Sequence, residues 1–302
     1  MIPLYIGSYK SGELDKKIEE AYERLHACDI CPRRCGVNRI RGEVGYCKAG
    51  INPKVSDYFP HFGEEKVLVG KRGSGTIFFT FCNLGCVFCQ NYTISHLGIG
   101  EEITVEDLAK IMLYLQKMGC HNINLVTPTH FVPQILSALK IAIEKGLNIP
   151  IVYNTSGYEN ISTLKLLEGV IDIYMPDIKF FDPKVAKKFS NAEDYPEITK
   201  MALKEMYRQV GDLKLNEKGI AERGLIIRHL LLPNNLSGLD GWLDFIKEEL
   251  STNVFLNIMD QYRPLYKAYQ YQEINRTITW KEYKHAIDLA LQKSFRNLYD
   301  EK

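Results

Sequence analysis

Three cysteines with the spacing C-x3-C-x2-C stand directly after an apolar run of the chain. They are Cys82, Cys86 and Cys89, and the run over residues 75–81 is rich in phenylalanine and threonine, which is typical of a buried strand. Thiolates favour soft metals, and three of them can converge on one centre without completing its coordination. The pattern predicts a soft-metal centre with one open position for chemistry. The alternatives are unrelated buried cysteines or half of a zinc site.

A second group of cysteines lies in the first fifty residues and consists of Cys28, Cys31, Cys35 and Cys47. Glycine and proline residues between them allow the backbone to wrap closely around an ion. Four thiolates are enough for a structural zinc site or for an auxiliary iron–sulfur cluster, and the spacing leaves both open. Either metal would stabilise an extension that has little core of its own. We expect the remaining cysteine, Cys120, to be a buried apolar residue.

Composition restricts the class of protein. The 302 residues are 45% hydrophobic and 25% charged, which is sufficient for a large core and argues against disorder. Lys+Arg (38) and Asp+Glu (37) nearly cancel, so no overall field would attract nucleic acid or an anionic membrane, although a local basic patch stays open. No signal peptide, no membrane-spanning run and no disulfide pattern is evident, and we expect a cytoplasmic protein in a reducing or oxygen-poor setting.

Strand and helix patterns alternate after residue 75. Strands are predicted at 76–81, 121–126, 150–154, 170–175, 225–232 and 253–258. Helices are predicted at 13–27, 104–118, 132–145, 160–168, 194–210, 239–250 and 279–293, with Thr104 and Thr279 as N-caps. Such alternation indicates an α/β fold with parallel strands, either a barrel or an open doubly wound sheet.

Polar residues follow each predicted strand, and in parallel α/β folds ligands bind at these strand ends. In chain order these residues are the three cysteines, Thr127 to His130, Asn154 to Gly157, Asp177 to Lys179, Arg228 with His229, and Asp260 to Arg263. Arg228 and His229 are neighbours on one strand, so only one of them can face the inside of a barrel. The sequence therefore predicts a site lined by several strand ends.

The cysteine triad after a strand, with Phe88 before its last member, resembles the signature of the radical S-adenosylmethionine (radical SAM) enzymes. The resemblance implies a partial (β/α)6 TIM-like barrel and a [4Fe-4S] cluster on the three cysteines, with SAM chelating the fourth iron. Gly75-Thr76, Gln90-Asn91 and Asp177-x-Lys179 are similar to the glycyl-radical activating enzymes, typified by the pyruvate formate-lyase activating enzyme. The chain most resembles a branch of their homologues that carries an N-terminal cysteine extension.

The resemblance also implies residues that hold SAM. These are Phe88 beside the adenine, Asn154 on the ribose, and Asp177 with Lys179 near the methionine moiety. The last pair could also be a salt bridge at the barrel rim. Ser156, which follows the same strand as Asn154, is a further candidate for binding the cofactor. The family's Gly-Gly-Glu after the second strand is replaced here by a segment that contains Thr127 and Thr129. Their hydroxyl groups could accept hydrogen bonds from the methionine ammonium group instead.

No catalytic residue beyond the cluster is identified, and the candidates are His130, His229 and Tyr262. His130 could equally be structural at the start of the following helix. Tyr262 begins a segment of alternating tyrosines and basic residues, up to Tyr271, which could bind RNA or a peptide or could close one end of the barrel.

The implied reaction is reductive cleavage of SAM to methionine and a 5′-deoxyadenosyl radical, which abstracts hydrogen from a substrate. It requires a low-potential electron donor such as ferredoxin or flavodoxin. The first candidate substrate is a glycyl-radical enzyme; RNA, a small molecule, or a non-catalytic electron-transfer or binding role are the alternatives. The expected organisation is a metal-bound extension over residues 1–70, the barrel over 71–270 and a C-terminal helical segment over 271–302.

Overall fold

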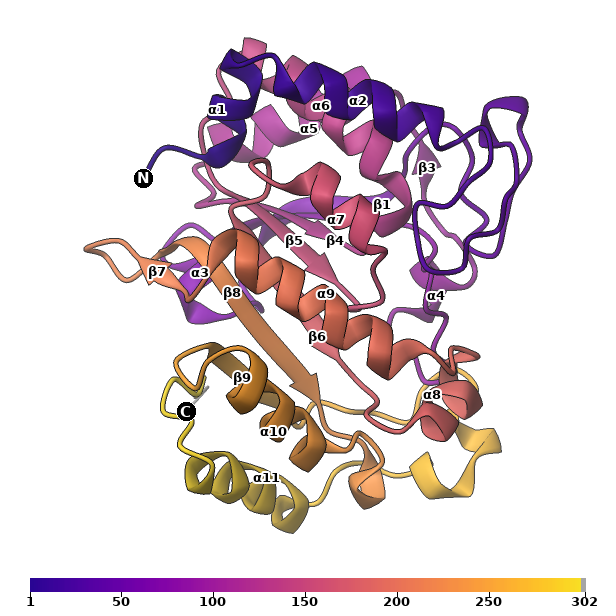
Figure 1. The fold of residues 1–302 in the computed structure, drawn as a ribbon, viewed down its shortest axis with the longest axis vertical. Helices are drawn as coiled ribbons and strands as arrows, with labels where there is room; N and C mark the ends of the chain where they lie inside the picture. The colour runs from indigo at the N-terminus through magenta and orange to yellow at the C-terminus, as the bar shows by residue number, and fades with distance from the viewer. Residues whose placement is uncertain (300–302) are drawn as a thin grey trace.

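The computed structural model describes residues 1–299, and at its centre six parallel strands lie side by side in chain order (Figure 1). They are β2 (Ser74–Phe79), β4 (Ile123–Val126), β5 (Ile151–Thr155), β6 (Ile173–Ile178), β8 (Ala221–Leu230) and β9 (Phe255–Met259). Each strand pairs in parallel with the one before it. The order never reverses, which excludes the doubly wound alternative. The sheet is not closed between β9 and β2, so the predicted partial six-stranded barrel is confirmed.

Three strands extend this sheet and were not predicted. They are β1 (Lys54–His61), which runs antiparallel to β2, β3 (Glu101–Glu102), which pairs with β1, and β7 (Lys214–Leu215), which pairs with β8. β1 is mostly half-exposed and contains Pro60, so it lacks the apolar alternation of a core strand. Because β1 and β2 pair, the division expected at residue 70 falls between two strands of one sheet.

Helices cover the outside of the sheet. Those predicted are confirmed to within a few residues: α2 (Glu13–Glu23), α5 (Val105–Lys117), α6 (Val132–Glu144), α7 (Ile161–Leu167), α9 (Tyr195–Val210), α10 (Leu239–Glu249) and α11 (Trp280–Gln292). Four helices of four to eight residues were not predicted: α1 (Leu4–Lys10), α3 (Lys66–Val69), α4 (Tyr92–Ser95) and α8 (Pro183–Ser190). Five 3-10 turns complete the list: η1 (Arg39–Arg41), η2 (Thr129–Phe131), η3 (Pro233–Asn235), η4 (Ala268–Gln270) and η5 (Gln272–Ile274).

The predicted N-caps are confirmed. Thr104 accepts a hydrogen bond from the backbone N–H of Asp107, and Thr279 forms a reciprocal capping box with Glu282. Helix α11 packs on α10 at the lower end of the molecule in Figure 1. Residues 300–302 of the predicted C-terminal segment lie outside the described residues.

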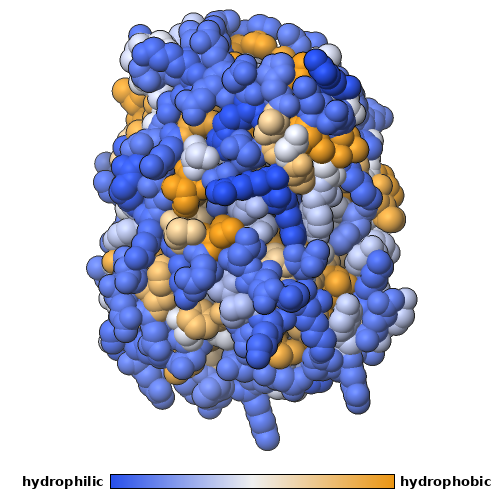
Figure 2. Space-filling view, turned by 45° about the vertical axis from the view of Figure 1, so that its right-hand side comes forward, coloured by the Kyte–Doolittle hydropathy of each residue, from blue (hydrophilic) through white to orange (hydrophobic). Residues whose placement is uncertain are grey.

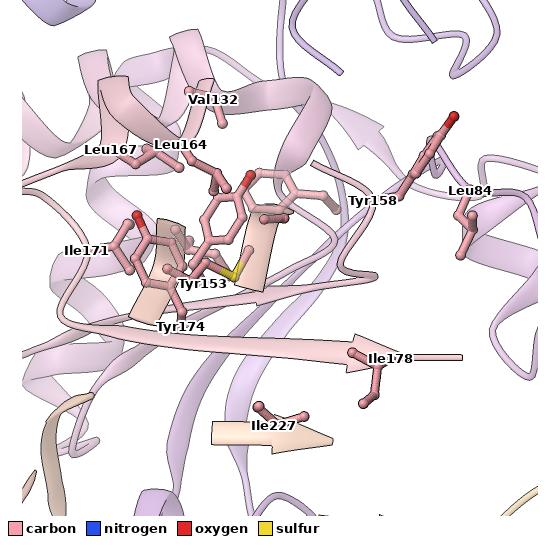
Figure 3. Packing of buried hydrophobic residues seen from close by; sticks show 14 of the residues in the cluster. Leu84, Val132, Tyr153, Tyr158, Leu164, Leu167, Ile171, Tyr174, Ile178 and Ile227 are labelled. Atoms are coloured by element: carbon pink, nitrogen blue, oxygen red, sulfur yellow. The ribbon is translucent and has the colours of Figure 1, made fainter. Parts of the chain in front are cut away.

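The core fills the space between the strands and the covering helices. In Figure 3, Tyr153 of β5 and Tyr174 of β6 lie beneath Leu164 and Leu167 of α7, and the two tyrosine rings meet edge to face with centroids 5.8 Å apart. Cys120 is buried in this core, as expected. None of the described helices is both long and apolar enough to cross a lipid bilayer.

Candidate functional site

A cavity lies at the carboxyl ends of the parallel strands. It consists of two adjoining hollows of about 370 Å³ and about 170 Å³. Nine residues line both hollows: Phe78, Cys86, Cys89, Asn91, Val126, Asn154, Asp177, Lys179 and Arg228. The larger hollow falls within the roughly 300–1,000 Å³ typical of ligand sites. The cavity therefore joins two of the cysteines to the ends of five parallel strands, β2, β4, β5, β6 and β8.

The cysteine triad lies in the turn that follows β2. Each sulfur accepts one hydrogen bond: Cys82 from the backbone N–H of Leu84 at 3.4 Å, Cys86 from Ser190 Oγ at 3.2 Å, and Cys89 from Ser95 Oγ at 3.1 Å. Donors of this kind favour thiolates over thiols. All three cysteines line the smaller hollow. Their convergence, predicted from the spacing alone, is present in the structure.

The backbone is strained where two strands open into the site. Phe81 after β2 has φ +65° and Thr127 after β4 has φ +57°, which places two non-glycine residues in the left-handed region. Phe81 is held there by a hydrogen bond from its N–H to the carbonyl of Ile94, and Thr127 by one to the carbonyl of Asn154. Strain of this kind occurs mainly at functional sites.

The residues present fit a cluster better than a single ion. Among residues 1–299, no three His, Cys, Asp or Glu side chains are close enough together to bind one metal ion. Three cysteines of an iron–sulfur cluster bind three different irons, so their sulfurs stand further apart than around one ion. Burial raises the pKa of Cys86 to about 12, and Lys179 opposes this rise. The triad therefore offers three sulfur donors along one hollow, with the Lys179 cation close to Cys86.

A chain of alternating charges crosses the cavity. Arg228 on β8 donates to Asp177 at 2.6 Å, to Glu64 at 3.0 Å and to the side-chain oxygen of Asn154 at 2.8 Å. Lys179 donates to the other oxygen of Asp177 at 2.8 Å. Asp177 and Lys179, predicted as a pair, are thus ion-paired and joined to Arg228, whose role had been left open.

These groups stay ionised although they are buried. Burial alone would raise the pKa of Asp177, but Arg228 and Lys179 reverse this effect and hold the pKa below its usual value. Glu64 behaves in the same way, because His61 and Arg228 outweigh its burial and lower its pKa. Burial would lower the pKa of Arg228, whereas its three acidic neighbours raise it. The cavity therefore offers fixed charges of both signs to a zwitterionic ligand such as an amino acid moiety.

Phe88, Thr127 and Ser156 also lie at the cavity. Phe88 lines the larger hollow and is buried against Phe180, Phe189 and Tyr262. Thr127 and Ser156 line the smaller hollow. The Ser156 hydroxyl is buried and has no hydrogen-bond partner among the described residues. A buried polar group of this kind requires a partner, which a bound cofactor can supply.

Thr129 and His130 do not reach the cavity, which corrects their assignment. The Thr129 hydroxyl is fully buried and donates to Glu159 at 2.6 Å, so it is not available to a ligand. His130 is buried and bonds to the backbone carbonyl of Thr80 at 2.7 Å. Burial lowers the pKa of His130 to about 4, so the ring is neutral near pH 7. Both residues therefore bond to groups beside the cavity and do not line it.

His229 and Tyr262 are likewise structural, which corrects their listing as catalytic candidates. His229 points away from the cavity and lies 2.9 Å from Ser237 Oγ, while its neighbour Arg228 faces inward, as the strand alternation requires. The Tyr262 hydroxyl donates to the carbonyl of Ile274 at 2.8 Å and its ring supports Phe88. Tyr262 therefore seals the end of the barrel.

The N-terminal cysteines form a separate group beside the cysteine triad. Cys28, Cys31 and Cys47 are buried and Cys35 is exposed. Burial raises the pKa of Cys31, and its neighbours Cys47, Cys28 and Cys35 add to the rise. A single zinc ion needs all four at about 2.3 Å, which requires the loop to close further. Zinc and an iron–sulfur cluster both stay open for this group.

Some residues of the site had no local sequence signal. His61 ends β1 and Glu64 lies in the connection after it, and Leu230 and Met259 are the last residues of β8 and β9. The adjacent Glu65 is buried with one oxygen lacking a hydrogen bond, and its other oxygen accepts from Asn257 at 2.8 Å. Only pairing of β1 with β2 brings this connection to the cavity, and no spacing within the chain indicates it.

The fold and the site together define a class: an open α/β barrel with a three-cysteine centre at its strand ends. Comparison with known proteins gives the family. The radical SAM superfamily profile matches residues 76–216, which include the cysteine triad and the pair of Asp177 and Lys179. The chain is 36% identical over 301 residues to the uncharacterized protein MJ0674 of Methanocaldococcus jannaschii, covering 96% of this chain and 82% of that one. It belongs to the radical SAM superfamily.

Two further comparisons agree. MJ0808, a second uncharacterized protein of Methanocaldococcus jannaschii, is 27% identical over 278 residues, which cover 82% of this chain and 74% of that one. Among solved structures, Streptococcus suis SuiB bound to the precursor peptide SuiA matches with a TM-score of 0.50 and 13% identity. The match covers 72% of this chain and 46% of SuiB, so less than half of SuiB has a counterpart here. At this identity the match shows the shared fold alone.

Proposed function

We propose that this protein binds a [4Fe-4S] cluster on Cys82, Cys86 and Cys89 and cleaves SAM reductively. The observation that carries the proposal is the single cavity that joins Cys86 and Cys89 to Asn154, Asp177 and Lys179. When bound, cluster and SAM supply a 5′-deoxyadenosyl radical that abstracts hydrogen from a substrate. The protein's own contribution is to bind, orient and shield the reactants.

The charged residues of the cavity divide this task. Lys179 can meet the methionine carboxylate and Asp177 its ammonium group, because the two side chains form an ion pair in the cavity and the pKa of Asp177 is held below its usual value. Arg228 donates hydrogen bonds to Asp177 and to the side-chain oxygen of Asn154. The second of these bonds fixes the orientation of the whole Asn154 amide group, including its nitrogen. Ser156 offers an unsatisfied hydroxyl group. Thr127 is the only one of the two threonines named above that can contact the methionine moiety.

The cavity continues beyond this cofactor region. Its far end is formed by His61, Glu64, Met259 and Gln261, none of which corresponds to a predicted SAM contact. A substrate can enter there and reach the cluster side. We place a protein or peptide substrate first, in line with the resemblance to glycyl-radical activating enzymes; SuiB, which shares the fold, is described as bound to its precursor peptide. RNA and small molecules are the alternatives, and a low-potential donor is required in each case.

The test of SAM cleavage uses anaerobically reconstituted protein with dithionite. We expect 5′-deoxyadenosine from the wild type and none from Cys82→Ala, Cys86→Ala or Cys89→Ala. Cys120→Ala is the matched control, because Cys120 is buried in the core away from the cavity. A wild-type protein with a full cluster that forms no 5′-deoxyadenosine would contradict the proposal.

The substrate class is tested separately. If the protein is an activase, a candidate glycyl-radical partner incubated with it, SAM and reductant acquires a glycyl radical signal in electron paramagnetic resonance. Wild-type SAM cleavage without such a signal on any glycyl-radical partner would favour RNA or a small molecule.

A further inference from the structure

Arg33 lies in the N-terminal cysteine loop, between Cys31 and Cys35, yet its side chain extends out of that loop. Its Nε donates to the carbonyl of Asn83 at 3.0 Å, and one Nη donates to the carbonyl of Leu84 at 3.1 Å. Asn83 and Leu84 are the two residues that directly follow Cys82 in the cluster-binding turn. Within residues 1–299, the Leu84 carbonyl also accepts a hydrogen bond from the Tyr46 hydroxyl.

The same guanidinium also contacts the end of helix α8. It donates to the carbonyl of Ser190 at 2.9 Å and to that of Asn191. These carbonyls lie at the helix C-terminus, where a cation is favoured. Ser190 in turn donates its hydroxyl to Cys86 Sγ at 3.2 Å, and the N–H of Val87 bonds to the carbonyl of Phe189 at 2.8 Å. Arg33 therefore links the turn to the helix that supplies a donor to one of its sulfurs.

Tyr46 supports this arrangement from a second position beside the N-terminal cysteines, next to Cys47. The Arg33 guanidinium lies over the Tyr46 ring at 4.0 Å, within cation–π distance. The Tyr46 hydroxyl bonds to the Leu84 carbonyl at 3.4 Å and occupies the space above Gly85. A Cβ on Gly85 would lie 2.6 Å from that oxygen, and Gly85 has φ +71°, so both space and backbone require glycine there.

The two cysteine groups also share a surface. A hollow of about 210 Å³ is lined by Cys47 of the N-terminal group and Cys82 of the triad, together with Tyr46 and Gly85. The N-terminal loops lie beside α4 in Figure 1, and Figure 2 brings this side of the molecule forward. The cluster-binding turn thus lies between the barrel and the N-terminal cysteine loop, which touches it directly.

The ends of the N-terminal loop are attached to the barrel by other contacts. Asn160 and Thr163 at the start of α7 donate to the carbonyls of Asp29 and Ile30 at 2.8 and 2.6 Å. These contacts hold the loop on the barrel without touching residues 82–86. Arg33 and Tyr46 are therefore the residues through which the conformation of the cysteine loop can affect the conformation of the cluster-binding turn.

We propose that Arg33 is a positioning residue that holds the turn from Cys82 to Cys86 in the shape that binds the cluster. The order of the N-terminal cysteine loop and the integrity of the cluster site are then coupled through it. This inference rests on the proposed function only in naming the cluster as the group that the turn binds. Arginine suits the position because its planar group presents five donors in a fixed arrangement, which a lysine ammonium cannot match.

Hydrogen exchange of the metal-free protein tests the positioning, with Arg33→Met as the main variant. We expect amides in residues 82–86 to exchange at least about ten-fold faster than in the wild type, because a charge-assisted link to two of their carbonyls is lost. Arg33→Lys should fall between the two, since it keeps the charge but not the geometry. Arg24→Met is the matched control, because Arg24 lies in the same N-terminal segment but bonds only to Asp29.

A purely fold-stabilising role for Arg33 would lower the global free energy of unfolding without selectively accelerating exchange at residues 82–86. That result would overturn the proposal. Amide exchange at residues 82–86 of Arg33→Met at the same rate as in the wild type would overturn it as well. If Arg33→Met does not fold, Arg33→Lys decides: faster exchange at 82–86 supports the proposal and unchanged exchange overturns it.

The coupling has a second readout in the reconstituted protein. SAM alters the electron paramagnetic resonance spectrum of a cluster only where an iron is open to it, so this change reports on the triad alone. We expect the SAM-dependent change to weaken in Arg33→Met and to persist in Arg24→Met; a wild-type spectral change in Arg33→Met would overturn the coupling. Absence of SAM cleavage by the wild type would remove the proposed function while leaving the exchange result intact.

Discussion

Arg228 is the residue on which most contacts of the cavity depend. It bonds to Asp177, Glu64 and Asn154 at once, and each of these would lose a partner if the guanidinium were replaced. A lysine at this position could satisfy only part of the set, because its ammonium is a single point of charge. Buried carboxylates that lose their charged partner lower the free energy of unfolding. Asp177 would also shift from its present position.

For Arg228→Lys we therefore expect SAM to bind at least about ten-fold more weakly and the free energy of unfolding to fall by about 1–3 kcal/mol. Equilibrium dialysis with SAM and urea denaturation measure the two effects. Arg208→Lys is the control, since Arg208 is half-exposed, pairs with Glu205 and Glu168, and lines neither hollow of the cavity. SAM affinity should be unchanged in this control. Unchanged SAM affinity in Arg228→Lys would remove it from the cofactor site.

His130 gives a prediction for the dependence of stability on pH. Its pKa falls from 6.5 to about 4 on folding, mainly because of burial. Below pH 6.5 the unfolded state binds a proton at this residue, and the folded state does not bind it until the pH approaches 4. The free energy of unfolding therefore falls as the pH falls from 6.5 towards 4. Between pH 7 and pH 5 the loss amounts to about 2 kcal/mol.

The variant His130→Gln has no such titration. We expect the wild type to lose about 2 kcal/mol more than His130→Gln between pH 7 and pH 5 in urea denaturation. Buried Glu159 and Asp172 have raised pKa values, mainly through burial, and shift stability in the opposite direction in both proteins. Comparing the two proteins at each pH cancels that contribution. Equal slopes would show that His130 is protonated or accessible in the folded state.

At the scale of single elements, β2 decides where the cluster-binding turn begins. Gly75 in this strand is packed so closely that an added Cβ would lie 2.7 Å from the carbonyl oxygen of Asn122 and 3.1 Å from Cys120 and Leu115. The resemblance identified Gly75 as part of the motif. The structure explains why a glycine is needed at this position, because β2 and β4 pair here and helix α5 packs on top.

Gly75→Ala should therefore destabilise the protein by about 1–3 kcal/mol, as overpacking of a tight core does. Gly7→Ala is a matched glycine-to-alanine control in helix α1, where a Cβ meets no atom within 4 Å. It should stabilise the protein by up to about 1 kcal/mol through helix propensity. Thermal denaturation of both variants measures these effects. A neutral Gly75→Ala would show that β2 can shift away from β4 without cost.

At the scale of the whole molecule, the two cysteine groups should differ in what they do for stability. The N-terminal loop rests on α7 and on the cluster-binding turn, and its only regular element is the 3-10 turn η1, so a bound metal there would stabilise a part with little secondary structure. The triad instead follows β2, which is paired with a strand on each side.

We expect the variant with Cys82, Cys86 and Cys89 replaced by alanine to keep metal at the N-terminal site. Removal of that metal by a chelator should lower the free energy of unfolding by at least about 2 kcal/mol. Metal analysis before and after chelation, with urea denaturation, measures both quantities. Zinc at one equivalent would exclude an auxiliary cluster there, and a variant without any bound metal would contradict a second site.

The sequence by itself determined the order of the fold. Periodicity located six parallel strands and the helices between them, because buried strands and amphipathic helices have strong local patterns. It also located the ligands of the metal centre, because Cys82, Cys86 and Cys89 are close in the chain and their spacing alone brings them together. The residues Asn154 and Asp177 followed from the rule that ligands bind at strand ends.

Only the tertiary structure decided which strand-end residues face the cavity and which support it. Thr127 and Thr129 are two residues apart, yet one lines the cavity and the other is buried against Glu159, because the left-handed turn at Thr127 ends the alternation of the strand. The contact of Arg33 with Asn83 spans fifty residues, and its partners are backbone carbonyls that any sequence would offer. Such contacts leave no pattern in the chain, because they depend on the packing of the N-terminal loop against the barrel.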